Sequence, residues 1–332
     1  MRAVQVTGDS ELAVVDAPGP GPGRGALLAV NTVGICGTDV KVFRGTIQTP
    51  RPLTMGHEAI ASVVEPGDLG ITAPGQRVLI DPAIACGHCS MCRDGRPSIC
   101  LNGGLMGREV DGVFSQFVRV PEERLIPVPD TVSDAATGIL QVLGTVVHAQ
   151  RSVDVFPGDV VAVVGLGVAG LLMVQILKQR GATVIGINRS EWKRHLAAEM
   201  GADAIGAPDE ARAIVDEYTG GQGVDVGVEA AGTERTLSQT IDLTKVGGEV
   251  LVFGTLTGGR EGLPYYQFYF KELTIRNPRA AMPSDYERGV RLVANGSLDV
   301  EKIITHRFSL EEAAGAFEAV QDSSSLKVLM SV

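Results

Sequence analysis

The feature that most constrains the fold of this chain is a change of rhythm near residue 150. There, short apolar runs begin to alternate with longer amphipathic stretches. Val160–Val164 is a continuous apolar run, as expected for a strand that is buried on both faces. A helical pattern follows over Val168–Arg180 and ends at Gly181. Because strands joined through helices pair in parallel, this part of the chain predicts a doubly wound parallel sheet.

The same alternation continues through the rest of that region. We expect strands at Thr183–Asn188, Val224–Glu229 and Glu249–Gly254, an extended run at Ala204–Ile205, and helices at Glu191–Met200 and Asp209–Tyr218. After about residue 280 the expected elements are the helices Ser284–Asn295 and Leu310–Gln321 and the strand Leu326–Val332. Residues 1 to about 145 are mostly β, with Gly- and Pro-rich turns between runs at Ala26–Thr32, Ala59–Glu65, Arg77–Asp81 and Ser115–Val120.

A glycine motif of the form G-x-G-x-x-G lies between the first of these strands and its helix. Its residues include Gly165, Gly167, Val168, Ala169 and Gly170. Gly165 permits the tight turn, Gly167 lets the backbone approach a pyrophosphate, and Gly170 lets helix and strand pack closely. The helix N-terminus faces the phosphates. In this context the motif predicts a dinucleotide site, and the alternative is a plain strand–turn–helix.

The residues that end the next strand bear on which dinucleotide binds. An NAD site usually has an acidic residue there, which bonds the ribose hydroxyls and would repel a 2′-phosphate. This chain has Asn188, Arg189 and Ser190 instead. Because the Arg189 guanidinium can pair with a 2′-phosphate, the segment favours NADP. NAD stays possible, since Asn188 can bond a ribose hydroxyl and Arg189 can stack on the adenine or stay solvated.

Four of the five cysteines form a C-x2-C-x2-C-x7-C cluster with glycines and a proline between them. They are Cys86, Cys89, Cys92 and Cys100. Four thiolates suit a closed, tetrahedral structural zinc site. An iron–sulfur cluster and two disulfides are the alternatives. The first is disfavoured because the chain otherwise has the pattern of a two-electron hydride enzyme, and the second by the expected compartment.

Charge and hydropathy exclude several classes of function. With 29 basic and 39 acidic residues the net charge is −10, so the chain lacks a basic footprint for nucleic acid or anionic membranes. No run approaches the ~20 apolar residues of a membrane helix. Met1–Val15 has neither the basic nor the apolar region of a signal peptide. We expect a cytoplasmic protein with a small-molecule substrate and no nucleic-acid or membrane partner.

The fifth cysteine, Cys36, lies in the segment Gly-Ile-Cys-Gly-Thr-Asp (Gly34–Asp39), and Gly-His-Glu (Gly56–Glu58) follows. Together with the cysteine cluster, the glycine motif and the late segment Ile304–Phe308, this order resembles the zinc-dependent medium-chain dehydrogenase/reductase family. The resemblance covers essentially the full length. Within the family the chain looks like the polyol, sugar and threonine dehydrogenases.

The resemblance implies an α/β chain of two domains. A GroES-like, β-rich catalytic domain over residues 1–145 and 281–332 would carry both zinc sites. A Rossmann domain with a doubly wound parallel sheet would cover residues 146–280. A catalytic zinc is expected at the domain cleft, with Cys36 and His57 as two ligands and an open position for the substrate.

The third ligand departs from the family pattern. Polyol-type members usually carry Glu-Pro where this chain has Gln141-Val142. A zinc ion with the Cys36 thiolate, neutral His57 and neutral Gln141 keeps a positive charge, and Glu58 would neutralise it. We therefore expect Glu58 to coordinate zinc at least part of the time, with Gln141 as a weaker ligand or hydrogen-bonding partner. The alternative is that Gln141 only hydrogen-bonds and the zinc is labile.

Thr38 matches the family's hydroxyl residue that contacts the substrate oxygen and relays its proton; otherwise it is a simple turn hydroxyl. Lys41 stands where many relatives carry a proton-relaying His, although a surface lysine is usually solvated. His88, His148 and His195 are more typical of solvated or structural residues.

The implied reaction is hydride transfer between a secondary alcohol or ketone, such as a polyol, sugar or cyclitol, and NAD(P). Rival classes are a zinc-free quinone or enone reductase, against which Cys36 and His57 argue, and a non-catalytic dinucleotide-binding protein. The segments Glu249–Thr255 and Glu272–Arg276 resemble the family's dimerising region, so a homodimer or homotetramer is expected. Candidate substrate-pocket residues are Phe43, Arg44, Glu109 and Arg279.

Overall fold

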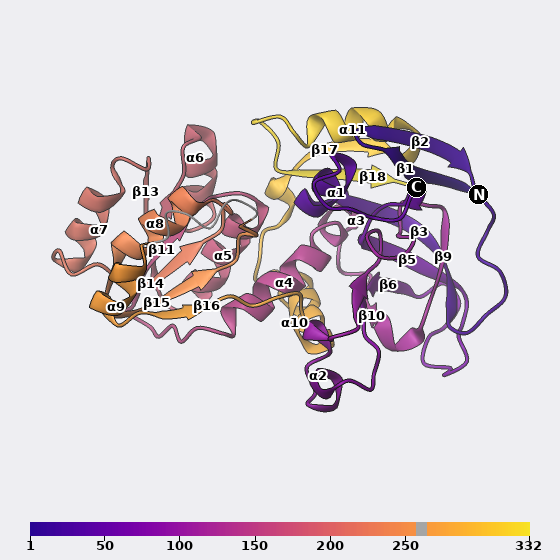
Figure 1. The fold of residues 1–332 in the computed structure, drawn as a ribbon, viewed down its shortest axis with the longest axis horizontal. Coiled ribbons are helices and arrows are strands. Elements are labelled where there is room, and N and C mark those ends of the chain that lie inside the picture. The colour runs from indigo at the N-terminus through magenta and orange to yellow at the C-terminus, as the bar shows by residue number, and fades with distance from the viewer. Residues whose placement is uncertain (257–263) are drawn as a thin grey trace. The chain divides into compact units, whose positions relative to one another are not determined.

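A computed structural model describes residues 1–256 and 264–332 (Figure 1). The chain divides into two compact units. The first unit is built from Met1–Thr145 and Ala280–Val332, and the second unit is the continuous segment Val146–Arg279. Among the described residues, no helix is long and apolar enough to cross a membrane.

The second unit is a six-stranded sheet in which every neighbouring pair of strands is parallel. Its strands are β11 (Val160–Val164), β12 (Thr183–Ile187), β13 (Ala204–Gly206), β14 (Val224–Glu229), β15 (Thr244–Val252) and β16 (Thr274–Arg276). Its helices are α5 (Val168–Gln179), α6 (Glu191–Glu199), α7 (Ala211–Thr219), α8 (Glu234–Leu243) and α9 (Tyr265–Lys271). The order β13-β12-β11-β14-β15-β16 is that of a Rossmann fold, as expected.

The sequence analysis misplaced the start of one strand in this unit and missed one helix. The strand expected over Glu249–Gly254 is β15, which begins five residues earlier, at Thr244. Its pairing register with β14 shifts after Thr244, so Gly247 and Gly248 lie inside a strand irregularity. Helix α8 was missed altogether. Its sequence signal is the N-cap Thr233, whose side chain accepts a hydrogen bond from the backbone N–H of Thr236.

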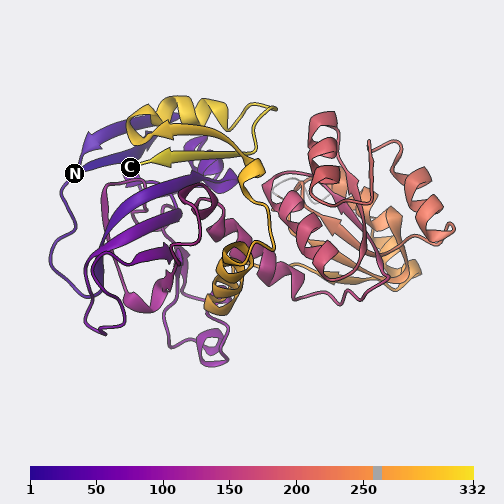
Figure 2. The same cartoon turned by 180° about the vertical axis from the view of Figure 1, so that it is seen from behind.

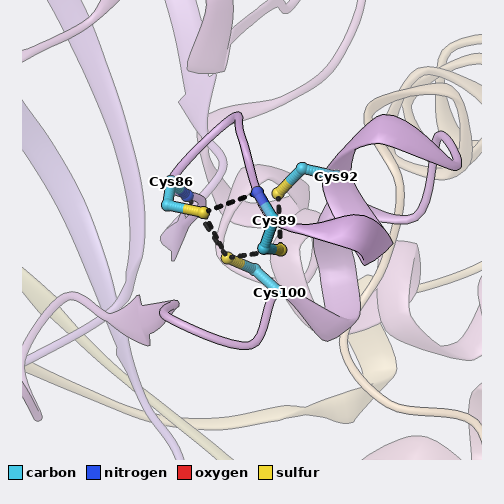
Figure 3. Close-up of side chains that lie close together, drawn as sticks. All are labelled: Cys86, Cys89, Cys92 and Cys100. Atoms are coloured by element: carbon cyan, nitrogen blue, oxygen red, sulfur yellow. Dashed lines mark hydrogen bonds between the residues drawn. The ribbon is translucent and has the colours of Figure 1, made fainter.

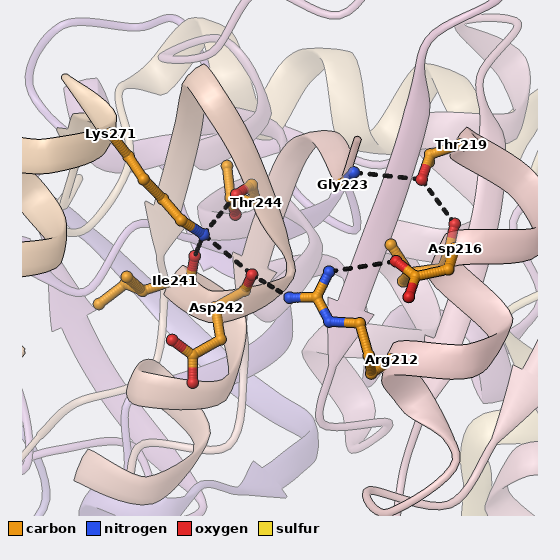
Figure 4. Close-up of polar contacts among 9 residues, drawn as sticks. Arg212, Asp216, Thr219, Gly223, Ile241, Asp242, Thr244 and Lys271 are labelled. Carbon is orange, nitrogen blue, oxygen red and sulfur yellow. Dashed lines mark hydrogen bonds and ion pairs between the residues drawn. The ribbon is translucent and has the colours of Figure 1, made fainter. Parts of the chain in front are cut away.

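Lys271 and Arg212 together bind the C-terminal end of α8 (Figure 4). The Lys271 ammonium donates to the backbone carbonyls of Ile241 and Asp242, each at 2.9 Å, and of Thr244 at 2.8 Å. Arg212 also donates to the Asp242 carbonyl. These carbonyls are among those that a helix leaves unpaired at its end, so the two cations fix where α8 stops.

The first unit is mostly β, as expected. Its strands are β1 (Arg2–Gly8), β2 (Glu11–Asp16), β3 (Ala26–Ile35), β4 (Leu53–Thr54), β5 (Glu58–Glu65), β6 (Arg77–Ile80), β7 (Ala83–Ile84), β8 (Gly104–Leu105), β9 (Phe117–Val120), β10 (Leu125–Pro127), β17 (Ile304–Ser309) and β18 (Lys327–Ser331). Its main sheet has the order β10-β6-β5-β3-β18-β17, with β9 also paired to β3. In both views the late strands β17 and β18 lie beside the N-terminal strands (Figure 1, Figure 2).

The helices of the first unit are α1 (Gly37–Phe43), α2 (Ser90–Arg93), α3 (Asp134–Thr137), α10 (Pro283–Ala294) and α11 (Ala313–Ala319), and α4 (Leu140–Gln150) crosses the boundary between the two units; 3-10 turns lie at Pro97–Ile99, Glu122–Arg124, Glu301–Ile303 and Leu310–Glu312. The helix expected over Ser284–Asn295 is α10, whereas α1, α2 and α3 were not predicted. The helix expected over Leu310–Gln321 is therefore a 3-10 turn followed by α11. Strand β3 extends past the expected end at Thr32 because its last residues pair with both β5 and β18.

Candidate metal centres and cofactor site

The register of three strands brings the expected catalytic residues to one edge of the main sheet. Gly34 in β3 lies opposite Glu58 in β5, so Cys36 and His57 follow at the same end. Ile35 lies opposite Val328 in β18, so Lys327 also reaches this edge. Ligand atoms of Cys36, His57 and Glu58 lie within 4.8 Å of one another. Three potential ligands therefore converge, as the sequence predicted.

Asp39, in the first turn of α1, orients two of these residues. Its Oδ2 accepts a hydrogen bond of 2.8 Å from the backbone N–H of Cys36, and its Oδ1 lies 3.3 Å from His57 Nδ1. Asp39 is completely buried. Because the carboxylate faces Nδ1, the Nε2 atom of His57 is the nitrogen left for a metal ion. Burial would lower the pKa of His57, but Asp39 and Cys36 outweigh burial and raise that pKa well above its usual value.

Glu58 forms a buried ion pair with Lys327. The Lys327 ammonium contacts Glu58 Oε2 and donates to the Ile35 carbonyl at 3.3 Å, and both side chains are at most 3% exposed. Gly34 makes room for the pair, because a Cβ there would lie 2.5 Å from Glu58 Oε2 and 2.6 Å from Lys327 Cε. Such a pair is stable in the interior only while both partners are present.

The charge argument made from the sequence, which balanced the zinc ion with the Cys36 thiolate and Glu58, did not include this ion pair. Lys327 already balances Glu58. Buried Asp39 supplies the second anion that, with the Cys36 thiolate, balances a dication. A thiolate, an imidazole and nearby carboxylates are ligands and partners that suit zinc, so these residues fit a zinc ion.

Gln141 lies in the first turn of α4 and is 8% exposed. Its Nε2 donates a hydrogen bond of 3.3 Å to the hydroxyl of Tyr286 in α10. Thr38 is half-buried in α1, two residues after Cys36. Gln141 therefore hydrogen-bonds with a buried residue of the first unit, and Thr38 lies in the same helix as buried Asp39.

The four sulfur atoms of the cysteine cluster lie close together (Figure 3). The Sγ–Sγ distances are 3.5 Å for Cys89–Cys92 and Cys86–Cys100 and 3.8 Å for Cys89–Cys100. A tetrahedral zinc ion with Zn–S bonds of about 2.3 Å spaces its sulfurs about 3.8 Å apart. Disulfide sulfurs would lie only about 2.05 Å apart. The spacing fits a single zinc ion and excludes disulfides in this structure.

The pKa values of the thiols in this cluster shift in opposite directions. A hydrogen bond from the backbone at His88 lowers the pKa of Cys86 to about 6, whereas burial and the neighbouring thiols raise the pKa of Cys92 to about 12. Four thiolates this close repel one another, so a cation is needed to hold all of them deprotonated. The chemistry of the donor set therefore also fits a dication.

The glycine motif has the geometry that its sequence predicted. Gly165 has a φ of +104°, which favours glycine, and a Cβ at Gly170 would overlap the carbonyl oxygen of Gly165. A Cβ at Gly167 would meet no atom within 4 Å. Gly165 and Gly170 are thus required by the fold, while Gly167, with Val168 and Ala169 at the start of α5, leaves open space where a dinucleotide would approach.

A second arginine, Arg194, lies beside Asn188, Arg189 and Ser190, the three residues that follow β12. Arg194 in α6 donates from Nη1 to the carbonyls of Asn188 at 2.9 Å and of Arg189 at 3.0 Å. The Arg189 side chain is exposed and Asn188 and Ser190 are half-buried. The three residues at the strand end therefore have two guanidinium groups among or beside them and none of the three is acidic, which suits a phosphate more than a bare ribose.

The other polar candidates make contacts within the first unit. Arg44 donates to Gln321, and Glu109 accepts from Arg108 and from the backbone of Leu105. His88 contacts the Cys86 carbonyl beside the cysteine cluster, as a loop residue would. Phe43 packs on Phe317. These contacts account for Phe43, Arg44 and Glu109 without a substrate.

Sequence reasoning missed four residues at these sites. Asp39 had a signal, because it lies within the quoted segment and three residues after Cys36, as a capping residue would. Arg194 had a weaker signal as a second cation near the strand end. Lys327 and Tyr286 had none, since they lie 269 and 145 residues from Glu58 and Gln141.

A Rossmann unit, a β-rich unit with a cysteine–histidine–glutamate centre and a four-cysteine cluster define a nicotinamide-type dehydrogenase with metal sites. Family models agree with this class: residues 21–130 match an alcohol dehydrogenase GroES-like domain and residues 168–295 match a zinc-binding dehydrogenase. The chain belongs to the zinc-dependent medium-chain dehydrogenase/reductase family and is an oxidoreductase that acts on alcohol groups.

Individual relatives cover nearly the whole chain. A sorbitol dehydrogenase of Halalkalibacterium halodurans is 30% identical over 99% of both chains. An L-threonine 3-dehydrogenase of Shewanella halifaxensis is 32% identical over 96% of this chain and 95% of its own length. A zinc-binding dehydrogenase of Sinorhizobium meliloti, solved with NADP bound, superposes with a TM-score of 0.92 at 34% identity, covering 100% of this chain and 99% of that one.

Proposed function

We propose that this chain is a two-zinc, NADP-preferring dehydrogenase that interconverts a secondary alcohol and a ketone, with a polyol, sugar or cyclitol as substrate. The observation that carries the proposal is the convergence of Cys36, His57 and Glu58, backed by Asp39 and Lys327. The sorbitol dehydrogenase relative supports a polyhydroxylated substrate.

In this proposal Cys36 and His57 hold the catalytic zinc, with Gln141 as third protein ligand and Glu58 as an alternative ligand when it leaves Lys327. Cys86, Cys89, Cys92 and Cys100 hold the structural zinc, in accordance with their sulfur spacing. Residues 1–145 and 281–332 act as the catalytic domain and residues 146–280 as the dinucleotide-binding domain. The division of the chain at residues 145 and 280 supports these boundaries to within one residue.

The reaction removes a hydride from the carbinol carbon and a proton from its hydroxyl, leaving a ketone and reduced nicotinamide. When bound, zinc lowers the pKa of the substrate hydroxyl and the nicotinamide ring accepts the hydride. Thr38 Oγ1 relays the hydroxyl proton: it accepts that proton and passes its own on toward solvent. Asp39 keeps His57 oriented through Nδ1, and the α5 N-terminus at Gly167 binds the pyrophosphate.

The preference for NADP has two supports. Arg189 and Arg194 leave the strand end cationic, and a relative with 34% identity was solved with NADP. We expect an Arg189→Ala variant to lose more affinity for NADP than for NAD, because only NADP has the 2′-phosphate. A selectivity ratio that does not change in this variant contradicts the assignment.

Metal analysis and a substrate screen test the proposal as a whole. We expect two zinc ions per chain and reduction of NADP with a member of a panel of polyols, sugars and aminocyclitols. One zinc ion per chain, lost in a Cys92→Ser variant and retained in a Cys36→Ser variant, would instead favour a reductase that has no catalytic zinc. Two zinc ions without turnover of any alcohol would favour a dinucleotide-binding protein that is not an enzyme.

A further inference from the structure

A buried phenol, Tyr286, holds one end of the Gln141 side chain. The Gln141 Nε2 atom donates to the Tyr286 hydroxyl at 3.3 Å, across 145 residues of sequence. Both residues are buried, with Tyr286 1% and Gln141 8% exposed. A hydrogen bond between two buried side chains is not exchanged with water, so it fixes which way each group faces.

The position of Tyr286 is set by the close packing of α10 and α4. A Cβ at Gly144 would overlap the Tyr286 ring, so this glycine opens the space that the ring fills. A Cβ at Gly289, one turn along α10, would lie 3.2 Å from Leu143. Two glycines on facing helices thus let the buried ring reach Gln141.

Tyr286 is a buried phenol, and a phenol is neutral near pH 7. A neutral hydroxyl oxygen accepts a hydrogen bond from an amide nitrogen and does not compete with a nearby carboxylate for a cation. Tyr286 is therefore suited to hold the nitrogen end of Gln141 and unsuited to bind the metal ion itself.

Orientation matters more for a carboxamide than for a carboxylate. Both oxygens of a glutamate can bind a metal ion, whereas a glutamine has a single suitable oxygen and turns its NH2 group toward the metal when reversed. With Nε2 held by Tyr286, Oε1 is the end of Gln141 that stays available.

We propose that Tyr286 is a positioning residue that fixes the Gln141 amide so that Oε1 serves as a ligand of the zinc ion at Cys36 and His57. This inference rests on the proposed function, in which Gln141 is the third protein ligand. It accounts for a glutamine at a position where similar polyol dehydrogenases usually carry glutamate.

The test measures zinc affinity with a colorimetric chelator in competition, in the wild-type protein and in Tyr286→Phe, which keeps the ring and removes the hydroxyl. A Cys36→Ser variant identifies the zinc that belongs to the four-cysteine cluster. We expect Tyr286→Phe to weaken zinc binding at Cys36 by about 10- to 100-fold, as loss of a ligand's hydrogen-bonding partner does elsewhere. The four-cysteine zinc should not change. The control is Tyr266→Phe, which removes an exposed phenol in α9 and should leave both affinities unchanged.

A double-mutant cycle with Gln141→Leu separates this inference from the proposal beneath it. If Gln141→Leu alone leaves zinc affinity unchanged, Gln141 is not a ligand and the proposed site itself fails. If Gln141→Leu weakens binding while Tyr286→Phe does not, only the positioning role fails. We expect Tyr286→Phe to have no further effect in the Gln141→Leu background. An undiminished effect there would show that Tyr286 acts by another route and would overturn the inference.

Replacing zinc by cobalt gives an independent readout of geometry, because the visible absorption of cobalt depends on its ligands. We expect the cobalt absorption bands of the Cys36 site to differ between the wild-type protein and Tyr286→Phe. Identical spectra for the two proteins would count against a change of ligand at that site.

Discussion

The glycines of the dinucleotide motif have separable roles that single substitutions can distinguish. Gly170→Ala places a methyl group against the Gly165 carbonyl, so we expect it to destabilise the fold by about 1–3 kcal/mol. Gly167→Ala meets no protein atom within 4 Å, so its stability should stay within about 0.5 kcal/mol of wild type. Urea unfolding of both variants measures these differences.

The same pair of variants separates stability from cofactor binding. The added methyl of Gly167→Ala would occupy the space through which the pyrophosphate approaches, so we expect its affinity for NADP to fall by about tenfold or more. Fluorescence titration with NADP measures this. Unchanged NADP affinity in Gly167→Ala would mean that the dinucleotide does not bind at this turn.

A buried carboxyl group near Tyr286 gives stability a dependence on pH. Burial raises the pKa of Asp81 to about 6, although the Ala83 N–H and Arg124 oppose the shift. Since the pKa in the unfolded chain is lower, this group favours folding most at pH values below about 4, and that contribution is lost as the pH rises through 6. We expect Asp81→Asn to stabilise the protein at pH 8 by up to about 3 kcal/mol.

Urea unfolding of the zinc-loaded proteins at pH 8 and pH 5 measures this effect. The stability difference between Asp81→Asn and wild type should shrink as the pH falls through 6. A difference of equal size at both values would mean that Asp81 is not protonated in this range. The carboxamide that replaces the carboxyl group keeps an oxygen that can accept from the Ala83 N–H, so the local turn should persist.

At the scale of one element, the end of α8 depends on a side chain from α9. Lys271→Met removes three hydrogen bonds from the carbonyls of Ile241, Asp242 and Thr244 and leaves them partly buried. We expect a loss of about 1–3 kcal/mol, because hydrogen bonds from a charged donor stabilise more than neutral ones. Thermal unfolding measures it. Lys302→Met, which removes a partner of Asp299 in an exposed ion pair, is the control and should change stability by less than about 1 kcal/mol.

The elements that the sequence predicted well are those with a strong local pattern. Helix α5 and strand β11 follow from a buried apolar run, a glycine turn and a periodic helix, all within about twenty residues of sequence. The start of strand β15 was misplaced because its first residues are set by an irregular pairing with β14, which the sequence of β15 alone does not reveal. Helix α1 was missed because it is only seven residues long, too short to show a clear helical period.

The candidate site shows the same limit more sharply. Cys36, His57 and the four clustered cysteines could be found from short motifs, because each ligand type and spacing has its own chemistry. Lys327 and Tyr286 come from distant elements, and the local sequence around a lysine or tyrosine does not indicate which distant residue its side chain will contact. The charge balance at Glu58 therefore could not be derived before the strand register was known.

At the scale of the whole molecule, we expect association through the outer edge of the second unit's sheet. Strand β16 pairs only with β15 among the described strands, and all three of its residues are exposed. An exposed edge of this kind readily pairs with another chain. We expect the wild-type protein to be a dimer or tetramer and Ile275→Lys to shift it toward the monomer, measured by light scattering after gel filtration. A monomeric wild-type protein would contradict this.

The division of the chain also sets an order for its synthesis. The second unit is one continuous stretch, whereas the sheet that carries Cys36 needs β18, which is made hundreds of residues later. Until Lys327 leaves the ribosome, Glu58 lacks the cationic partner that it has in the folded protein. We expect the Rossmann unit to become protease-resistant first in chains stalled after residue 300, while residues 1–145 stay sensitive. The nascent chain would then carry a folded second unit before the first unit can complete its main sheet.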